Sequence, residues 1–113
     1  MLTAVANGKW CGGGFKSCPK ASLQDGLMDI GVVRPVKGMR FLRLFLKYRA
    51  GTHLQDKEAD KYVKYMQLSK FTIKPKNEFN VSIDGEVFKF PESNFEVIPG
   101  AISFVVPEGS EII

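Results

Sequence analysis

The sequence predicts a mainly β protein, an antiparallel β-sandwich with one amphipathic helix. Short apolar or alternating runs recur along the chain, separated by turn residues at intervals of roughly eight to twelve residues. A single stretch has a helical period, and no strand–helix–strand series indicates a parallel sheet. The chain has 113 residues, 44% of them hydrophobic and nine of them Phe. This length and composition fit one domain with its own core.

Two strands and a glycine-rich loop make up the predicted N-terminal part. Residues 2–6 are apolar and residues 28–33 are apolar and β-branched, with Pro35 ending the second strand. The intervening residues 7–26 form a loop rich in glycine, which adopts backbone angles that are closed to other residues. A short strand around Phe15 is compatible with this pattern.

Residues 37–48 predict the helix, and Gly51 is a C-cap signal. Arg40, Arg43 and Lys47 fall on one narrow basic stripe, and the rest of the helix is almost entirely apolar. Two interpretations follow. Either both apolar sides are buried within the domain and the basic side chains are solvated, or one apolar side faces a partner domain or a membrane surface.

The remaining residues predict strands, after a polar segment that is a loop or a short helical turn. The predicted strands are residues 63–68, 70–74, 79–83, 87–90, 95–98 and 101–106. Asp84-Gly85 makes a tight hairpin turn between two of them, and Pro99-Gly100 joins the last two. His53, the single histidine, lies in the polar segment and is interpreted as a solvated loop residue.

Charge and cysteine content exclude several classes of protein. The net charge of +4 fits an anionic partner, but the sequence has no RNP, helix-turn-helix or Cys/His finger pattern, so no nucleic acid is expected. Cys11 and Cys18 lack zinc-ligand spacing; we expect two reduced thiols, although a disulfide is geometrically open to them. Without a signal-like start or an apolar run of about 20 residues, the expected location is cytoplasmic.

Two acidic turns are the candidate chemical sites. Asp25 stands beside a glycine where the loop enters a strand, and its carboxylate could hold a hard cation together with neighbouring carbonyls. Asp84 and Glu86 flank the tip of the predicted hairpin, where they could share a proton, hold a metal or act as a general base. Each turn is also explained as an ordinary turn with solvated acids.

The order of these segments resembles a known family. The segments are Asn7-Gly8-Lys9, Gly12-Gly13-Gly14, Cys18-Pro19, Asp25-Gly26-Leu27-Met28-Asp29 and Ile83-Asp84-Gly85-Glu86. Together they are similar to the C-terminal half of the diacylglycerol kinase/sphingosine kinase-like lipid kinases, in particular the bacterial soluble branch. The resemblance implies that residues 1–113 are a single β-sandwich domain of the NAD kinase/diacylglycerol kinase-like fold. It also implies that the N-terminal nucleotide-binding domain, with its Gly-Gly-Asp-Gly-Thr motif, is absent from this chain.

The resemblance also implies roles for individual residues. Asp25 matches the acid that binds a structural Mg²⁺, and the carbonyls of Ser22 and Leu27 match the other protein ligands of that ion. Gln24 departs from the Asp or Asn often found at its position.

The second acidic turn matches the catalytic part of the family. Glu86 corresponds to a general base for the lipid hydroxyl and Asp84 to its neighbour, while Asn7 and Gly8 correspond to a segment close to the interdomain cleft and to bound cofactor. ATP would be bound mainly by the missing domain, so this chain alone is expected to be inactive. The implied partners are a diacylglycerol-like or sphingoid lipid, the N-terminal domain, a membrane surface contacted peripherally, and a second copy in a homodimer. The alternative function is a non-catalytic lipid- or protein-binding β-sandwich module.

Overall fold

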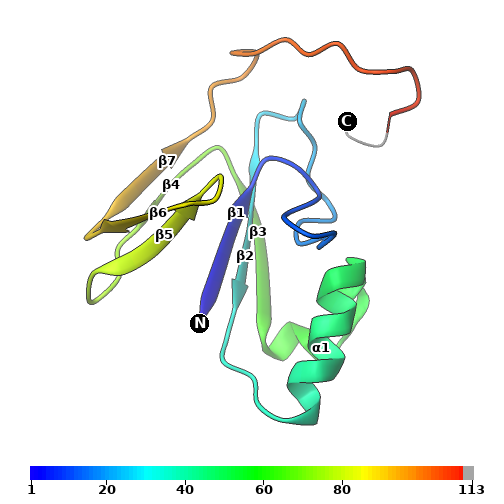
Figure 1. The fold of residues 1–113 in the computed structure, drawn as a ribbon, viewed down its shortest axis with the longest axis vertical. Helices are drawn as coiled ribbons and strands as arrows, with labels where there is room; N and C mark the ends of the chain where they lie inside the picture. The colour runs from blue at the N-terminus through cyan, green and yellow to red at the C-terminus, as the bar shows by residue number, and fades with distance from the viewer. Residues whose placement is uncertain (111–113) are drawn as a thin grey trace.

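The computed structural model describes residues 1–110, and its elements follow the predicted order (Figure 1). The elements are β1 Leu2–Ala6, β2 Met28–Val33, α1 Met39–Ala50, the 3-10 helices η1 His53–Gln55 and η2 Ala59–Lys61, β3 Val63–Leu68, β4 Lys70–Ile73, β5 Phe79–Ile83, β6 Glu86–Phe90 and β7 Ser93–Glu96. All strand pairs within residues 1–110 are antiparallel. The predicted mainly β class is therefore confirmed.

A three-stranded sheet in the order β1-β2-β3 organises the first half of the chain. The β-branched strand β2 lies in its centre, with Asp29 opposite Ala6 on one side and opposite Gln67 on the other. Because β2 has a partner along each edge, its backbone groups are satisfied on both sides. Asp29, Ile30 and Gly31 in this strand are also buried.

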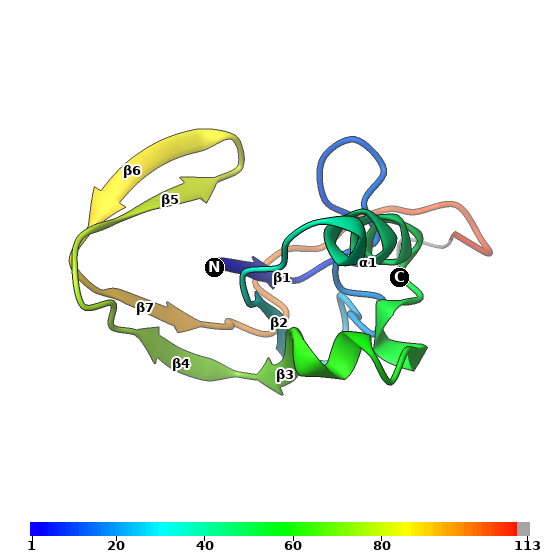
Figure 2. The ribbon, with the colours of Figure 1, turned by 90° about the horizontal axis from the view of Figure 1, so that it is seen from below.

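The rest of the chain forms two separate two-stranded ribbons, β4–β7 and β5–β6. Figures 1 and 2 show that the ribbons are joined at one end and diverge toward the other. Phe71 stacks on Phe95 across the first ribbon, with ring centroids 4.8 Å apart. Nevertheless, no residue after Val63 in the described part of the chain is buried.

The buried core lies between α1, η2 and the start of β3. Leu44, Ala59 and Val63 form its buried cluster, and Val33 and Tyr62 are among the half-buried side chains packed against it. Helix α1 begins after Gly38, whose φ of 67° is left-handed, so the helix starts two residues later than predicted. It ends at the predicted cap, Gly51, whose φ of 76° fits glycine.

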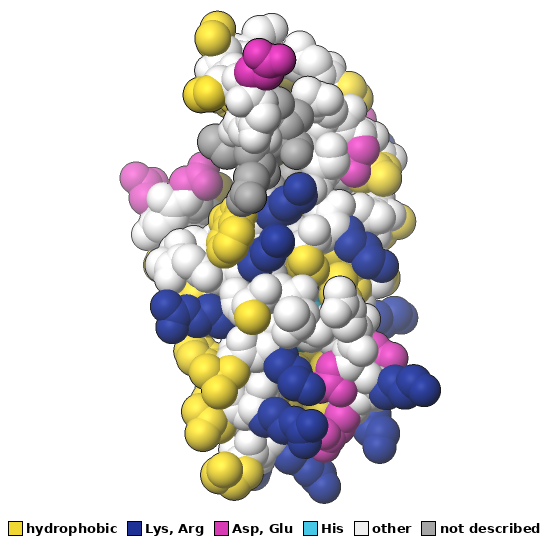
Figure 3. All heavy atoms as spheres, turned by 90° about the vertical axis from the view of Figure 1, so that its right-hand side faces the viewer, with side chains coloured by type: hydrophobic (Ala, Val, Ile, Leu, Met, Phe, Trp, Pro, Cys, Tyr) yellow, Lys and Arg dark blue, Asp and Glu magenta, His cyan; other side chains and the backbone are white. Residues whose placement is uncertain are grey.

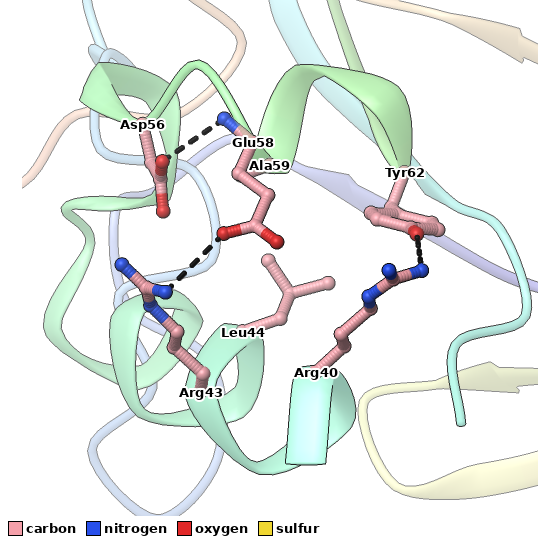
Figure 4. Close-up of a pocket in the computed structure, with 7 residues that line it drawn as sticks. All are labelled: Arg40, Arg43, Leu44, Asp56, Glu58, Ala59 and Tyr62. Atoms are coloured by element: carbon pink, nitrogen blue, oxygen red, sulfur yellow. Dashed lines mark hydrogen bonds and ion pairs between the residues drawn. The ribbon is translucent and has the colours of Figure 1, made fainter. Parts of the chain in front are cut away.

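The basic stripe of α1 has partners as well as solvent: Arg40 and Arg43 are exposed, as expected, but each of its three side chains also contacts another side chain. Arg43 forms an ion pair with Glu58 at 3.3 Å, and Lys47 forms one with Asp56. Figure 4 shows that both acids come from the connection between α1 and β3, as does Tyr62, whose hydroxyl accepts a hydrogen bond from Arg40. The stripe therefore faces this connection, although exposed pairs of this kind contribute little to stability.

His53 was also misinterpreted, because its side chain is 1% exposed. Its ring lies 4.7 Å from that of Tyr48 in α1, and neither ring nitrogen has a hydrogen-bond partner among the described residues. Burial lowers the pKa of His53 by more than the nearby backbone carbonyl of Lys47 raises it. The polar sequence around His53 hid this packing, which depends on a helix that precedes it.

Two further predictions need correction. Residues 101–106, predicted as the final strand, form no strand in the structure, and the strand predicted at 95–98 lies at Ser93–Glu96. The predicted short strand around Phe15 is reduced to a single bridge between Cys11 and Phe15. Each error concerns pairing, which a local pattern of apolar residues does not determine.

Candidate functional site

The glycine-rich loop closes on itself at one end of the three-stranded sheet. The backbone N–H of Cys11 donates to the carbonyl of Phe15 at 2.8 Å, and the N–H of Cys18 donates to the carbonyl of Lys9 at 3.4 Å. Asn7 is exposed and Gly8 is half-buried at the point where β1 enters this loop. These backbone hydrogen bonds hold the loop together at this end of the sheet.

Both cysteines are free, with Cys11 exposed and Cys18 buried. Burial, together with the charge of Asp29, raises the pKa of the Cys18 thiol to about 11. A thiol with this pKa is protonated and unreactive near neutral pH. The expectation of two unpaired thiols is confirmed, and Cys18 is a structural residue.

The turn at Asp25 has a defined geometry. The Oδ1 atom of Asp25 accepts a hydrogen bond from the N–H of Leu27 at 2.9 Å, and the N–H of Gln24 donates to Oγ of Ser22 at 3.4 Å. Gly26 has a φ of 68°, and a Cβ built there would lie 3.5 Å from Cγ of Pro99. The turn is therefore held at its base and lies against the C-terminal segment.

This turn offers few strong ligands to a metal ion. Asp25 is exposed, and the described residues contain no group of three or more His, Cys, Asp or Glu side chains that could hold a metal. Mg²⁺ is often bound in proteins through one or two carboxylates, with several waters retained. The residues present fit a hard cation in that sense only, with one carboxylate and the neighbouring carbonyls.

The second acidic turn joins β5 to β6. Asp84 has a φ of 49° and Gly85 a φ of 94°, and Ile83 pairs with Glu86 across the turn. Two left-handed residues in a two-residue loop match the twist of a hairpin. Asp84 and Glu86 are exposed, and neither carboxylate pairs with another side chain within residues 1–110.

The structure does not bring the two acidic turns together. In the part of the chain it describes, no hydrogen bond or ion pair joins Asp84 or Glu86 to the loop that carries Asn7, Gly8 and Asp25. Figure 2 shows the β5–β6 ribbon as a separate arm beside the three-stranded sheet. The candidate site residues are thus divided between two parts of the molecule.

A buried polar cluster between the loop and the sheet escaped the sequence reasoning. Asp29 is fully buried, and its Oδ1 accepts hydrogen bonds from the Tyr65 hydroxyl and, at 3.0 Å, from Nε2 of Gln67. Its Oδ2 has no partner among the described residues. Burial, followed by the hydrogen bond to Asp29, raises the pKa of Tyr65. The cluster could have been predicted from the polar residues that face each other on β2 and β3. That prediction would have required the register of the two strands.

An exposed apolar face lies along α1. Phe41, Leu42 and Leu46 are each at least half exposed. A groove of about 320 Å³ runs beside this face, between α1 and the first residues of β1. Figure 3 shows Lys and Arg side chains gathered over the lower part of one side of the molecule, next to hydrophobic ones. The interpretation in which both apolar sides of the helix are buried was therefore wrong, since Leu44 is its one buried residue in the described chain.

The structure defines a mainly β class of domain, with antiparallel strands and exposed carboxylates on two turns. Residues 1–106 match the family described as the YegS C-terminal NAD kinase beta sandwich-like domain, and the chain belongs to this family. The resemblance to lipid kinases that the motifs indicated is confirmed by this match and by the names of similar proteins.

Three similar proteins are all named "Probable lipid kinase YegS-like". The protein of Shewanella frigidimarina is 32% identical over 107 residues, which are 95% of this chain and 33% of the relative. The proteins of Chromohalobacter salexigens and Pseudomonas aeruginosa are each 26% identical over 113 residues, the whole of this chain and 35% of each relative. The chain thus spans about a third of the length of the curated relatives it matches.

Two other observations are negative. No solved structure matches this chain. None of the helices within residues 1–110 has the length and hydrophobicity needed to cross a membrane.

Proposed function

We propose that this chain is the C-terminal domain of an ATP-dependent lipid kinase. The observation that carries the proposal is the family match over residues 1–106, together with relatives that are named probable lipid kinases and are about three times as long. The acceptor is a lipid hydroxyl of a diacylglycerol-like or sphingoid substrate. ATP is bound mainly by the part of the longer protein that precedes this domain.

In this proposal Glu86 is the general base. Its carboxylate accepts the proton of the lipid hydroxyl while the hydroxyl oxygen attacks the γ-phosphorus of ATP, and the bond to the β-phosphate oxygen breaks to leave ADP and a phosphorylated lipid. The exposed position of Glu86 beside a hairpin tip supports this role. Asp84 is its neighbour on the other side of the turn and adds negative charge there.

Asp25 is the proposed ligand of a structural Mg²⁺, with the carbonyls of Ser22 and Leu27. The hydrogen bond from the Leu27 N–H fixes one oxygen of this carboxylate and leaves the other free for the ion. The ion would supply fixed positive charge next to the loop, and Asn7 and Gly8 would form the adjoining edge of the cleft toward the nucleotide.

The test is substitution in the longer protein that carries this domain. Glu86→Gln keeps the size of the side chain but removes its basicity, so we expect turnover to fall by about 10²- to 10⁴-fold with nucleotide affinity little changed. Glu78→Gln, at the other end of the same hairpin, is the matched control and should have nearly normal turnover. Unchanged turnover in Glu86→Gln would remove this residue from the base role.

The 113-residue chain alone provides a second arm of the test. The proposal assigns the nucleotide to a part of the protein that this chain lacks, so we expect no ATP-dependent phosphorylation of diacylglycerol or sphingosine vesicles by the chain. Detectable phosphorylation that is lost in Glu86→Gln would contradict the assignment of ATP to the rest of the protein.

The second candidate function is a non-catalytic module that binds a lipid surface. It is favoured by the exposed apolar face of α1, where Leu42 is 50% and Leu46 is 57% exposed. Arg43 and Lys47 are poor probes of this function because their reversal would break the ion pairs to Glu58 and Asp56. Leu46→Asp is the better probe. Cosedimentation with anionic vesicles that is lost in Leu46→Asp but retained in Glu86→Gln supports the module.

A further inference from the structure

Residues 101–106 are a strand sequence for which the described structure has no partner. The segment, Ala-Ile-Ser-Phe-Val-Val, combines β-branched and aromatic residues with high β propensity. Its side chains up to Val105 are nonetheless exposed, Ile102 by 71%, Phe104 by 72% and Val105 completely, and Val106 is half-buried. In Figure 1 the segment runs across the top of the molecule, away from the ribbons β4–β7 and β5–β6.

Two turns bound this segment as they would bound a strand. The N–H of Ala101 donates to the carbonyl of Ile98 at 3.4 Å, and the N–H of Ser110 donates to the carbonyl of Pro107 at 3.2 Å. Gly100 lies at φ 68° in the first turn. Between the turns, residues 102–106 make no backbone hydrogen bond within the described chain.

This arrangement leaves the backbone of residues 102–106 without hydrogen-bond partners in the described chain and leaves the side chains of residues 101–105 exposed. An exposed segment with unpaired N–H and C=O groups is a template for pairing with another strand. Clustered exposed apolar residues typically mark an interaction surface. A strand added to a sheet edge satisfies the backbone through main-chain hydrogen bonds and buries side chains on at least one face.

The length of the relatives indicates which strand is the partner. The family match extends to residue 106, so the segment is part of the family domain and not an appended tail. The relatives share this domain, and the rest of each relative is about twice as long as the domain. The name of the family places this domain at the C-terminal end, so a strand that pairs with the segment in every relative would come from the additional chain that precedes it.

We propose that residues 101–106 form a β-strand by pairing with an edge strand in the N-terminal part of the longer protein. This inference rests on the proposal that the chain is one domain of that protein, but not on its catalytic chemistry. Cγ of Pro99 lies 3.5 Å from where a Cβ of residue 26 would be, so the segment starts close to the Asp25 turn. Pairing of the segment therefore holds that turn beside the N-terminal part and fixes the width of the cleft between them.

Amide hydrogen exchange in the full-length Shewanella frigidimarina relative tests the pairing without ATP or lipid. We expect the amides aligned with residues 102–106 to exchange at least about 100-fold more slowly than an unstructured peptide of the same sequence. Proline at the position aligned with Val105 removes a donor and should abolish this protection, whereas alanine at that position should retain most of it. Exchange at the unstructured rate in the full-length protein would overturn the proposal, whether or not the enzyme phosphorylates lipid.

The 113-residue chain gives the complementary result. Here we expect residues 102–106 to exchange freely and the chain to remain monomeric by light scattering. A concentration-dependent dimer in which these amides become protected would assign the segment to a second copy, and it would overturn the proposed partner. Because the segment makes no pairing contact in this chain, Val105→Pro should leave its melting temperature within about 1 °C of the unsubstituted chain, which separates lost pairing from lost folding.

Discussion

The two halves of this chain use similar strand sequences but bury very different amounts of side chain. Every buried residue in the described chain lies between Ser17 and Val63, in the three-stranded sheet, its loop, α1 or the η segments. The ribbons β4–β7 and β5–β6 have apolar residues of the same kind, yet Ile83, Val87 and Phe88 remain exposed. Strand sequence alone thus does not produce a core; a strand also needs a layer that covers it.

Topology explains the difference. Strand β2 has neighbours on both edges, and a layer made of α1 and the η segments contributes Leu44 and Ala59 to the core. Each ribbon has two strands, and an isolated two-stranded ribbon is marginal in water. The well-packed half carries the Asp25 turn, and the loosely packed half carries Asp84 and Glu86. The proposed site therefore combines residues from a packed part and from a loosely packed part of the chain.

The largest effect that tests this comparison is expected at Leu44. Leu44→Ala removes a buried side chain from the cluster with Ala59 and Val63, and we expect a loss of about 2–5 kcal/mol in the free energy of unfolding measured with urea. Val87→Ala in the exposed ribbon is the matched control and should cost less than about 0.5 kcal/mol. Equal losses at the two positions would contradict the division into a packed and an unpacked half.

The next effect is expected at the buried polar cluster. Asp29→Ala leaves the half-buried Tyr65 hydroxyl without its acceptor, at a cost of about 1–3 kcal/mol in urea unfolding, whereas the exposed Gln67 amide keeps the carbonyl of Lys20 at 3.5 Å. The control is Asp60→Ala in the exposed η2 segment, which should be close to neutral. If Asp29→Ala were as neutral as Asp60→Ala, the cluster would not stabilise the loop on the sheet.

A smaller effect is expected at the cap of α1. Gly51 has a φ of 76°, and a Cβ built there lies 2.7 Å from Cδ of Lys16, so Gly51→Ala should lower the free energy of unfolding by about 1 kcal/mol or somewhat more. Gly13→Ala is the control, because a Cβ added there meets no heavy atom within 4 Å and the φ of Gly13 is not left-handed. A stabilised Gly51→Ala chain would show that this helix end is not constrained as described.

The smallest effect is a pH dependence from His53. Its pKa is lowered from 6.5 in the folded chain by burial, so the unfolded chain binds the proton more readily. The stability that this implies is fully present above about pH 6.5 and declines as the pH falls below that value toward the folded pKa. Urea midpoints between about pH 5.5 and 7.5 at constant ionic strength should show this decline, and His53→Phe should flatten it. A midpoint that rises on acidification would contradict the buried, unpartnered ring.

The sequence was informative where the signal is local. Alternation located β5 and β6, and the left-handed turn at Asp84-Gly85 lies where its composition placed it. It failed for His53 and for residues 101–106, because burial of the first depends on Tyr48 and pairing of the second depends on a partner strand. The polar sequence around His53 and the apolar run at residues 101–106 can be read locally. Burial and strand pairing depend on segments that are distant in the sequence.

The same limit applies to the candidate site. The order of short motifs identified Asp25 and Glu86 as parts of one family pattern, and the match over residues 1–106 confirms the family. Their relative placement could not be obtained in this way, since no described contact joins the hairpin to the loop of Asp25. The family could be predicted from the order of short motifs along the chain. The distance between the two turns could not, because it depends on how the two halves of the chain pack against each other.

Native-state hydrogen exchange of the 113-residue chain tests the division between its two halves most directly. Amides in β2, β3 and α1 should share the slowest exchange, close to that set by global unfolding, whereas amides in β5 and β6 should exchange orders of magnitude faster through local opening. That gradient is the result expected from a core confined to residues 17–63. Uniform slow exchange from β1 through β7 would show a single cooperative core and would contradict the division into a packed half and a loosely packed half.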